Sequence, residues 1–165
     1  MHLAPLPPID TPAVQAWLTA LPPEQRAPLA AASAYLGPLL EQAPYLLDLA
    51  QANAGWLAGA LADTADGALA DILDAVQSAG REAADEEALS PVLRIAKGRT
   101  ALLAAIAEAG GAWTTAQATA ALSDLADAAL DACLNLLMRE AAERGKLTIP
   151  AEEATAANSG LALFA

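Results

Sequence analysis

The spacing of polar and apolar residues between positions 114 and 145 constrains the fold of this chain more than any other feature. Two stripes repeat at intervals of three or four residues, as the 3.6-residue turn of an α-helix requires. The polar stripe is Asp124, Asp127, Asp131 and Asn135, and the apolar stripe includes Leu122, Leu125, Ala129, Cys133 and Leu137. Thr114 or Thr115 is expected to cap this helix, and Gly145 is expected to end it.

The rest of the 165 residues shows the same helical preference. Hydrophobic residues make up 56% of the chain but aromatic residues only 4%, and much of the apolar content is Ala and Leu, which favour helices. Two more long helices are predicted, one capped by Asp66 and running to about Asp85, the other from about Glu86 to Ala109. The inner stripe of the second is expected to be Leu89, Leu93, Ala96, Leu103 and Ile106. The composition and spacing therefore predict an all-α, multi-helix bundle.

The two ends of the chain differ from this middle part. Residues 1–11 are Pro-rich and are expected to be extended, and Thr11-Pro12 is expected to start the helical region 12–158 with a hydroxyl N-cap. Short helices are predicted before residue 61, interrupted at prolines such as Pro38. Residues 161–165 form an uncharged apolar run that is typical of a buried strand. Residues 159–165 are therefore expected to begin a further domain, cut before its sheet is complete.

Charge and composition exclude several kinds of partner. The 8 basic and 20 acidic residues give a net charge of −12, which repels phosphate backbones and anionic lipids. Nucleic acid and membrane surfaces are not expected partners, and charged residues interrupt every apolar stretch before it reaches the length of a membrane span. The single cysteine, Cys133, is expected to be a small buried hydrophobe, and the chain is expected to be cytoplasmic.

The usual catalytic patterns are missing from the sequence. There is no paired-cysteine or histidine-rich metal spacing, no Gly-rich phosphate loop, and the single histidine is His2. Asp124, Asp127 and Asp131 could in principle hold a divalent cation, but a solvated helix face is the preferred interpretation. No catalytic residue and no metal ligand are predicted in this chain.

One cluster of basic residues stands out in this acidic chain. Arg94, Lys97 and Arg99 are three of its eight cations. Arg94 and Lys97 lie one helical turn apart and share a face, whereas Arg99 points elsewhere. Two interpretations remain open: internal ion pairs with acidic neighbours, or an anion contact to a nucleotide phosphate or to the carboxylates of a partner.

Several segments resemble one known family when they are taken in order. The run Leu-Arg-Ile-Ala-Lys-Gly-Arg at 93–99 resembles the Leu-Arg-x-x-(Lys/Arg)-x-Arg run of glutamine synthetase adenylyltransferases. It is followed, as in that family, by a glycine at 110–111 and by Thr-x-x-Leu-Ser-x-Leu-Ala-Asp at 119–127. Residues 33–36 with 43–46 are similar to the family's N-terminal pattern. The resemblance covers about residues 30–165 and is strongest over 93–131.

This resemblance implies a role for the two parts of the chain. Residues 1–158 would be helices that precede a catalytic nucleotidyltransferase sheet, and 159–165 would be its first strand. In the family, a Gly-rich turn and a Ser-Asp-Ile-Asp run follow that strand, and the two aspartates hold the catalytic metal. Neither is present here, so no catalytic residue can be carried over.

The family also implies an activity for the parent enzyme. It attaches AMP from ATP to a tyrosine of glutamine synthetase and removes that AMP by phosphorolysis, under the influence of a PII protein. Magnesium and ATP are then expected for the parent enzyme, no cofactor is expected for this chain, and the chain itself is expected to be a non-catalytic scaffold. A homodimer through the unpaired apolar edge is a further expectation. The alternative is a free-standing helical adaptor that docks a partner in a groove.

Overall fold

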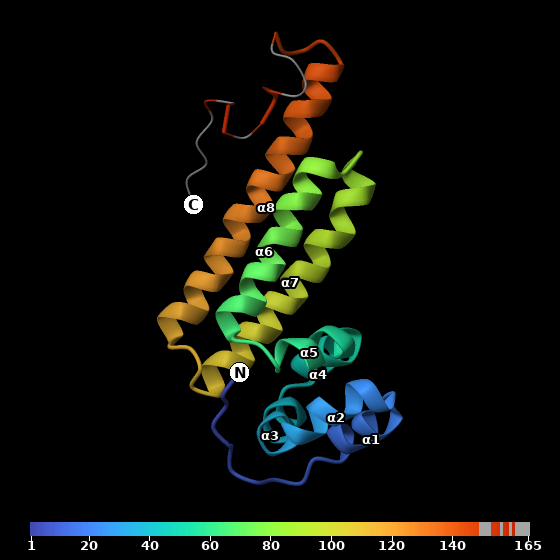
Figure 1. The fold of residues 1–165 in the computed structure, drawn as a ribbon, viewed down its shortest axis with the longest axis vertical. Coiled ribbons are helices and arrows are strands. Elements are labelled where there is room, and N and C mark those ends of the chain that lie inside the picture. The colour runs from blue at the N-terminus through green and yellow to red at the C-terminus, as the bar shows by residue number, and fades with distance from the viewer. Residues whose placement is uncertain (149–152, 156, 159, 161–165) are drawn as a thin grey trace. The chain divides into compact units, whose positions relative to one another are not determined.

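A computed structural model describes residues 1–148, 153–155, 157–158 and 160 of the chain. Over these residues the chain forms eight α-helices and no strand (Figure 1), which confirms the all-α prediction. The helices are α1 (Pro12–Ala20), α2 (Pro23–Ala31), α3 (Ser33–Gln42), α4 (Pro44–Ala52), α5 (Ala54–Ala60), α6 (Ala65–Glu82), α7 (Glu86–Ala109) and α8 (Thr115–Glu143). The strand expected at 159–165 falls on positions that, apart from 160, lie outside the described residues. Within the described part, no helix is both long enough and apolar enough to cross a bilayer.

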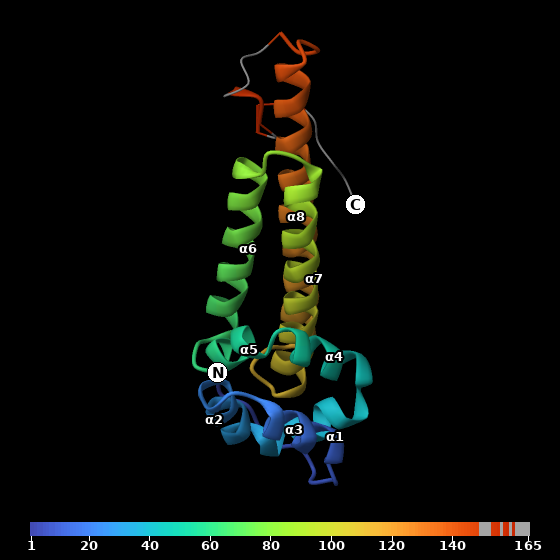
Figure 2. The same ribbon diagram turned by 90° about the vertical axis from the view of Figure 1, so that its right-hand side faces the viewer.

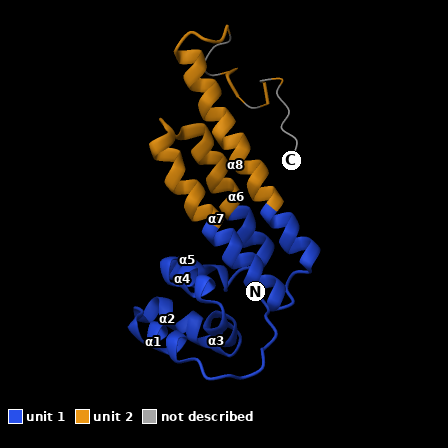
Figure 3. Cartoon of the chain, turned by 180° about the vertical axis from the view of Figure 1, so that it is seen from behind, with its two compact units in different colours: residues 1–71, 98–122 blue, residues 72–97, 123–165 orange. Residues whose placement is uncertain are grey.

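The chain divides into two compact units, coloured separately in Figure 3. The first unit comprises residues 1–71 and 98–122, and the second comprises residues 72–97 and 123–165. The three longest helices, α6, α7 and α8 (Figures 1 and 2), each contribute one part of their length to each unit.

The first unit is built from the five short helices around one apolar core. Helices of seven to ten residues are marginal in isolation, so packing stabilises them: α1 contacts α2 and α3, and α2 contacts α5. The buried core residues are Val14, Trp17, Leu18, Leu29, Tyr35, Leu36, Leu40, Ala50, Ala54, Leu57, Leu102 and Ile106. Leu102 and Ile106 come from α7, so the long helix provides the surface on which the short helices pack.

The start of α1 is capped differently from the sequence prediction. Pro12 is the first residue of the helix as expected, but the hydroxyl of Thr11 makes no capping hydrogen bond. Instead, the carboxylate of Glu41 on α3 accepts hydrogen bonds from the backbone N–H groups of Ala13 (3.3 Å) and Val14 (3.0 Å). A carboxylate is favourable there, because the first N–H groups of a helix have no partner within the helix.

The long helices begin and end mostly at the predicted signals. Asp85 accepts a hydrogen bond from the N–H of Ala88 (2.9 Å) at the start of α7. At the start of α8, the Thr114 hydroxyl accepts from the N–H of Gln117 (3.3 Å), and the Gln117 side chain accepts from the N–H of Thr114 (2.9 Å). This reciprocal pair is a capping box. Gly111 and Gly145 follow α7 and α8 with positive φ angles of 74° and 67°, as helix-terminating glycines do.

The predicted cap of α6 is wrong by two residues. The helix begins at Ala65, and the hydroxyl of Thr64 accepts a hydrogen bond from the N–H of Gly67 (3.0 Å). Asp66 therefore lies in the first turn, where its carboxylate accepts a hydrogen bond from the indole N–H of Trp113 (2.8 Å). Threonine and aspartate can both cap a helix, so the local sequence does not distinguish Thr64 from Asp66 as the cap of α6.

The second unit contains a close contact between α6 and α8. A Cβ atom added to Gly80 would lie only 2.5 Å from the Cα atom of Ala132, so glycine is what allows the two backbones to approach. Arg139 of α8 strengthens this contact, because its guanidinium donates hydrogen bonds to the carbonyls of Gly80 (3.0 Å), Arg81 (2.8 Å) and Ala83. These carbonyls lie at the end of α6, where helix carbonyls need external donors.

Of the predicted apolar stripe of α8, Leu125 is buried as expected, whereas the other four members lie beside the buried face. Leu122 and Leu137 are 47% and 61% exposed, and Ala129 and Cys133 are half-buried. The buried residues of this helix are Ala118, Ala121, Leu125, Ala128, Ala132 and Leu136. They also recur at three- and four-residue intervals, but four of the six are alanines. Helices that approach closely select small residues, and a pattern of hydrophobicity alone does not identify them.

Candidate functional site

The three predicted anion-contact residues do not converge on one site. Successive residues of an α-helix are rotated by about 100°, so Arg99 points about 140° away from Arg94 and about 160° away from Lys97. Arg94 and Lys97 are exposed, whereas Arg99 is half-buried. Arg94 borders a shallow hollow with the first-turn residue Glu87 of α7. Arg99 is thus the one member of the cluster that is set into its surroundings.

These three cations form no ion pair with the described residues. Over the described residues, the ion pair within 4.0 Å is Arg144–Glu140 (2.9 Å) on α8. Glu87 borders the same hollow as Arg94 but forms no ion pair with it, and an exposed ion pair contributes too little to fix long side chains. None of Arg94, Lys97 and Arg99 has a carboxylate within 4.0 Å among the described residues, and both interpretations of these cations remain predictions.

Arg99 is held by two neighbours that come from a distant part of the sequence. Its Nε–H donates a hydrogen bond to the side-chain oxygen of Asn53 (3.2 Å), and its guanidinium lies 5.3 Å from the ring centroid of Trp56. This is a cation–π contact. Burial lowers the pKa of Arg99, but a guanidinium remains charged in proteins.

The partners of Arg99 are themselves positioned by the junction of α4 and α5. Asn53 lies between these helices, and its side-chain NH₂ donates to the carbonyl of Leu49 (2.9 Å). That bond directs the other side-chain atom, the acceptor oxygen, toward Arg99. A Cβ added to Gly98 would lie 3.2 Å from the side chain of Leu49, so the glycine next to Arg99 lets Leu49 lie against α7.

Sequence reasoning did not identify Asn53 and Trp56 as part of a site. Asn53 lies at the break between α4 and α5, and Trp56 is an apolar residue of α5. The hydrogen bond from Arg99 to Asn53 spans 46 residues, and no local spacing indicates such a contact. Its only sequence signal was the unusual density of cations around Arg99.

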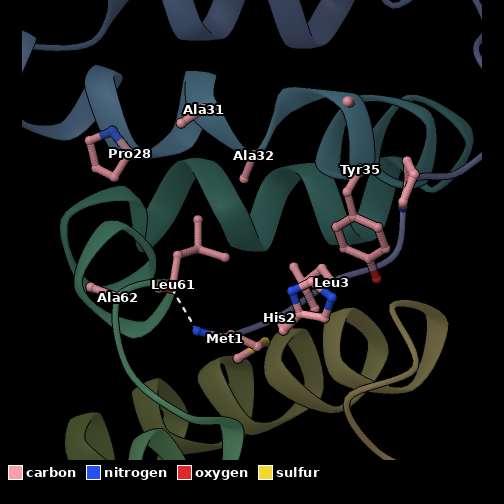
Figure 4. A pocket seen from close by; sticks show the side chains of 11 residues that line it. Met1, His2, Leu3, Pro28, Ala31, Ala32, Tyr35, Leu61 and Ala62 are labelled. Atoms are coloured by element: carbon pink, nitrogen blue, oxygen red, sulfur yellow. Dashed lines mark hydrogen bonds between the residues drawn. The ribbon is translucent and has the colours of Figure 1, made fainter.

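A cavity of about 440 Å³ lies elsewhere in the first unit, next to the N-terminal residues (Figure 4). The N-terminal ammonium donates hydrogen bonds to the carbonyls of Leu61 (2.9 Å) and Asp63. Tyr35 lines the cavity, and its hydroxyl donates a hydrogen bond to the buried carbonyl of Ile106. Burial raises the pKa of Tyr35 to about 12. The other lining side chains are apolar except His2, so this cavity brings together no acid–base pair suited to catalysis.

The acidic residues of α8 do not assemble a metal site. Asp124, Asp127 and Asp131 are exposed, and the described residues contain no group of three or more His, Cys, Asp or Glu side chains that could hold a metal ion. This agrees with the interpretation of these aspartates as a solvated helix face. Cys133 is half-buried rather than buried, because it lies beside the alanine face of α8 and not on it.

The described part of the chain is thus an all-helical, acidic protein region in which one arginine is held against a tryptophan. Comparison with known families identifies it further. The family model described as glutamate-ammonia ligase adenylyltransferase matches residues 24–165. The chain therefore belongs to this family, as the resemblance of its sequence motifs implied.

Curated relatives support this assignment. The chain is 34% identical over 156 residues to a protein of Rhodopseudomonas palustris (strain HaA2), an alignment that covers 90% of this chain and 16% of the relative. It is 35% identical over 157 residues to one of Bradyrhizobium diazoefficiens, covering 92% of this chain and 16% of the relative. A relative from Xanthobacter autotrophicus is 37% identical over 140 residues, an alignment that covers 85% of this chain and 14% of the relative. Each is described as a bifunctional glutamine synthetase adenylyltransferase/adenylyl-removing enzyme.

These coverages limit what the relatives say about the chain. The chain spans about one sixth of the length of the first two relatives. No solved structure matches the chain significantly. The family is therefore established, whereas the activity of the whole enzyme belongs to the proposal below.

Proposed function

We propose that this chain is an N-terminal helical scaffold of an enzyme that adds AMP to a tyrosine of glutamine synthetase and removes it again. The observation that carries this proposal is the match of residues 24–165 to the adenylyltransferase family, together with the all-helical character of the described residues. In this proposal, the chain positions the rest of the enzyme and does not itself transfer AMP.

The chemistry of adenylyl transfer supports this division of roles. Such transfer requires charge stabilisation on a phosphoryl group, which carboxylates and a bound divalent metal supply. The described residues do not fit a magnesium site, because their acidic side chains form no cluster that could hold one. We therefore assign ATP and magnesium to the remainder of the family enzyme and derive no catalytic step from this chain.

The direct test is an AMP-transfer assay on the purified 165-residue chain. Glutamine synthetase, labelled ATP and magnesium are added for the forward reaction, and adenylylated glutamine synthetase with phosphate for the reverse reaction. We expect no transfer in either direction, while a full-length bifunctional relative, as positive control, performs both. Label transfer that increases with the concentration of the pure chain would overturn the proposal.

A second candidate function is a helical adaptor, and one observation favours it. Leu130 and Leu137 of α8 are 42% and 61% exposed and lie two helical turns apart on one face, and contiguous exposed apolar surface is typical of docking sites. The adaptor proposal expects the isolated chain to bind glutamine synthetase or a PII protein without further domains. Calorimetric titration with each protein distinguishes the two functions, since a scaffold that acts only within the whole enzyme gives no heat of binding.

The expected homodimer through the unpaired apolar edge involves residues 161–165, which lie outside the described residues, so it remains a prediction; α8 is a second surface that could form a dimer. A homodimer through exposed apolar residues would give twice the chain mass in light scattering. Replacement of Leu137 by Glu would restore the monomer if α8 forms the interface, and would have no effect if the dimer uses another edge.

A further inference from the structure

The guanidinium of Arg99 is fixed in place but leaves most of its donors unused. A guanidinium carries five N–H donors. The Nε–H bonds to Asn53, and one face of the group lies over Trp56. Within the described part of the chain, the two Nη groups donate to no residue. An arginine that is held on one edge and one face presents its remaining edge in a fixed direction.

This geometry favours an oxyanion with two oxygens in one plane. The two Nη groups can donate parallel hydrogen bonds to both oxygens of one carboxylate. The cost of ordering a long arginine side chain is already met by Asn53 and Trp56, so less entropy is lost on binding. Of the 20 acidic residues of the chain, none in the described part lies within 4.0 Å of Arg99.

The charge at this position selects the class of anion. Arg94 and Lys97 point to other faces of α7, so they do not add their charges to that of Arg99. A nucleotide polyphosphate is typically held by several cations and a glycine-rich backbone, whereas a single guanidinium suits a singly charged group. Trp56 and Leu49 add apolar surface beside the cation, and both are half-buried.

We propose that Asn53, Trp56 and Arg99 form a binding site for a carboxylate group, which we name the Arg99 site. The carboxylate is either that of a small dicarboxylic acid or that of an acidic side chain on another protein. This assignment goes beyond the scaffold role, and its test measures binding to the isolated chain. Its outcome is therefore independent of any AMP transfer.

The test follows the Nε–H resonance of Arg99 and the indole N–H resonance of Trp56 by two-dimensional NMR. Potassium glutarate is titrated into the full 165-residue chain while potassium chloride keeps the ionic strength constant. We expect both resonances to shift saturably with glutarate and not with chloride alone. This readout needs no variant, so it remains decisive even if substitutions disturb folding. The absence of a saturable shift would overturn the proposal.

Three variants make the assignment specific to Arg99. Arg99→Gln is expected to weaken glutarate binding about tenfold or more, because a charge-assisted pair of hydrogen bonds is lost. Arg99→Lys retains the charge but not the planar fork, and is expected to restore only part of the affinity. Arg94→Gln removes the same charge from the same helix and is expected to bind glutarate as the native chain does. Equal losses in Arg94→Gln and Arg99→Gln would show a general charge effect and overturn the site.

Two further ligands identify the class and source of the anion. A short peptide with glutamate beside leucine is compared with glutarate. Tighter binding of the peptide supports a protein side chain as the source, and equal or weaker binding supports a free dicarboxylate. Inorganic phosphate is the third ligand, and tighter binding of phosphate than of either carboxylate would overturn the assignment of the site to carboxylates.

Discussion

The side chain of Thr100 is fully buried on α7, and its hydroxyl has no hydrogen-bond partner among the described residues. A buried hydroxyl without a partner loses its hydrogen bonds to water and gains none in return. The hydroxyl of Thr100 therefore lowers the stability of the first unit relative to an apolar side chain of the same shape.

We expect Thr100→Val to stabilise the chain by about 1 kcal/mol, because valine has the same shape and requires no hydrogen-bond partner. Urea denaturation followed by circular dichroism measures the free energy of unfolding. Thr100→Ser serves as the control, since it keeps the hydroxyl and loses a methyl group, and it should be less stable than the native chain. A destabilised Thr100→Val variant would show that the hydroxyl has a partner in solution.

Tyr35 makes stability depend on pH in the alkaline range. Its pKa is raised from 10.0 to about 12 by burial, so the folded chain holds this proton more tightly than the unfolded chain. The contribution of this shift to the free energy of unfolding is complete below pH 10. It is lost as the pH rises from 10 to about 12, and it amounts to roughly 1.4 kcal/mol for each unit of difference between the folded and unfolded pKa. Tyr35→Phe should be less stable at neutral pH, because the hydrogen bond to the carbonyl of Ile106 is lost. Its free energy of unfolding should decrease less steeply above pH 10 than that of the native chain. Tyr45→Phe, at an exposed tyrosine, should keep the native slope.

Interactions between neighbours in the sequence were predictable, and distant ones were not. The caps at Asp85 and Thr114 follow from rules that act within four residues. The cap provided by Glu41 joins residues 27 positions apart, and a local pattern carries no information about such a partner. The same reason explains why Arg99 was singled out while Asn53 and Trp56 were not.

At the scale of helices, the contact between α6 and α8 depends on the absence of a side chain at Gly80. The substitution Gly80→Ala would place a methyl group against the backbone of Ala132. We expect it to destabilise the chain by about 1–3 kcal/mol, as overpacking does. Gly59→Ala is the matched control, since this helical glycine has open space around its Cβ position, and it should stabilise by roughly 0.5–1 kcal/mol. Thermal and urea denaturation of both variants tests the pair, and similar effects at the two glycines would contradict the close contact.

The sequence predicted α8 and its length well, but not the face that is buried. Leucine at 122 and 137 and alanine at 121 and 132 are all apolar, so two stripes compete in the same helix. The distance between neighbouring helices decides between them, and this distance follows from Gly80 and the alanines together. A prediction that weights side chains by hydrophobicity chooses the leucines and is wrong for that reason.

For the whole molecule, composition was sufficient to predict the class of fold. An excess of alanine and leucine over β-branched residues leaves few alternatives to helices, and every element within the described residues is a helix. The division into two units was not predictable, because it passes through α6, α7 and α8. The apolar pattern of each long helix continues without a break across the boundary between the units, so the sequence does not mark this boundary.

The net charge of −12 leads to a prediction about salt. With a single carboxylate ion pair among the described residues, repulsion between acidic groups outweighs attraction, and salt screens it. We expect the thermal midpoint to rise between low and physiological ionic strength. Asp127→Asn should reduce this rise, because Asp124, Asp127 and Asp131 repel one another one turn apart on α8. A midpoint that falls with salt would mean that favourable ion pairs dominate.

The cap of α1 by Glu41 also has a consequence during synthesis. Helix α1 has nine residues and is too short to persist alone. Its first N–H groups bond to the side chain of Glu41 on α3, which is synthesised 27 and 28 residues later. The nascent chain therefore lacks this cap of α1 until α3 has emerged, and we expect α1 to become persistent only after that point.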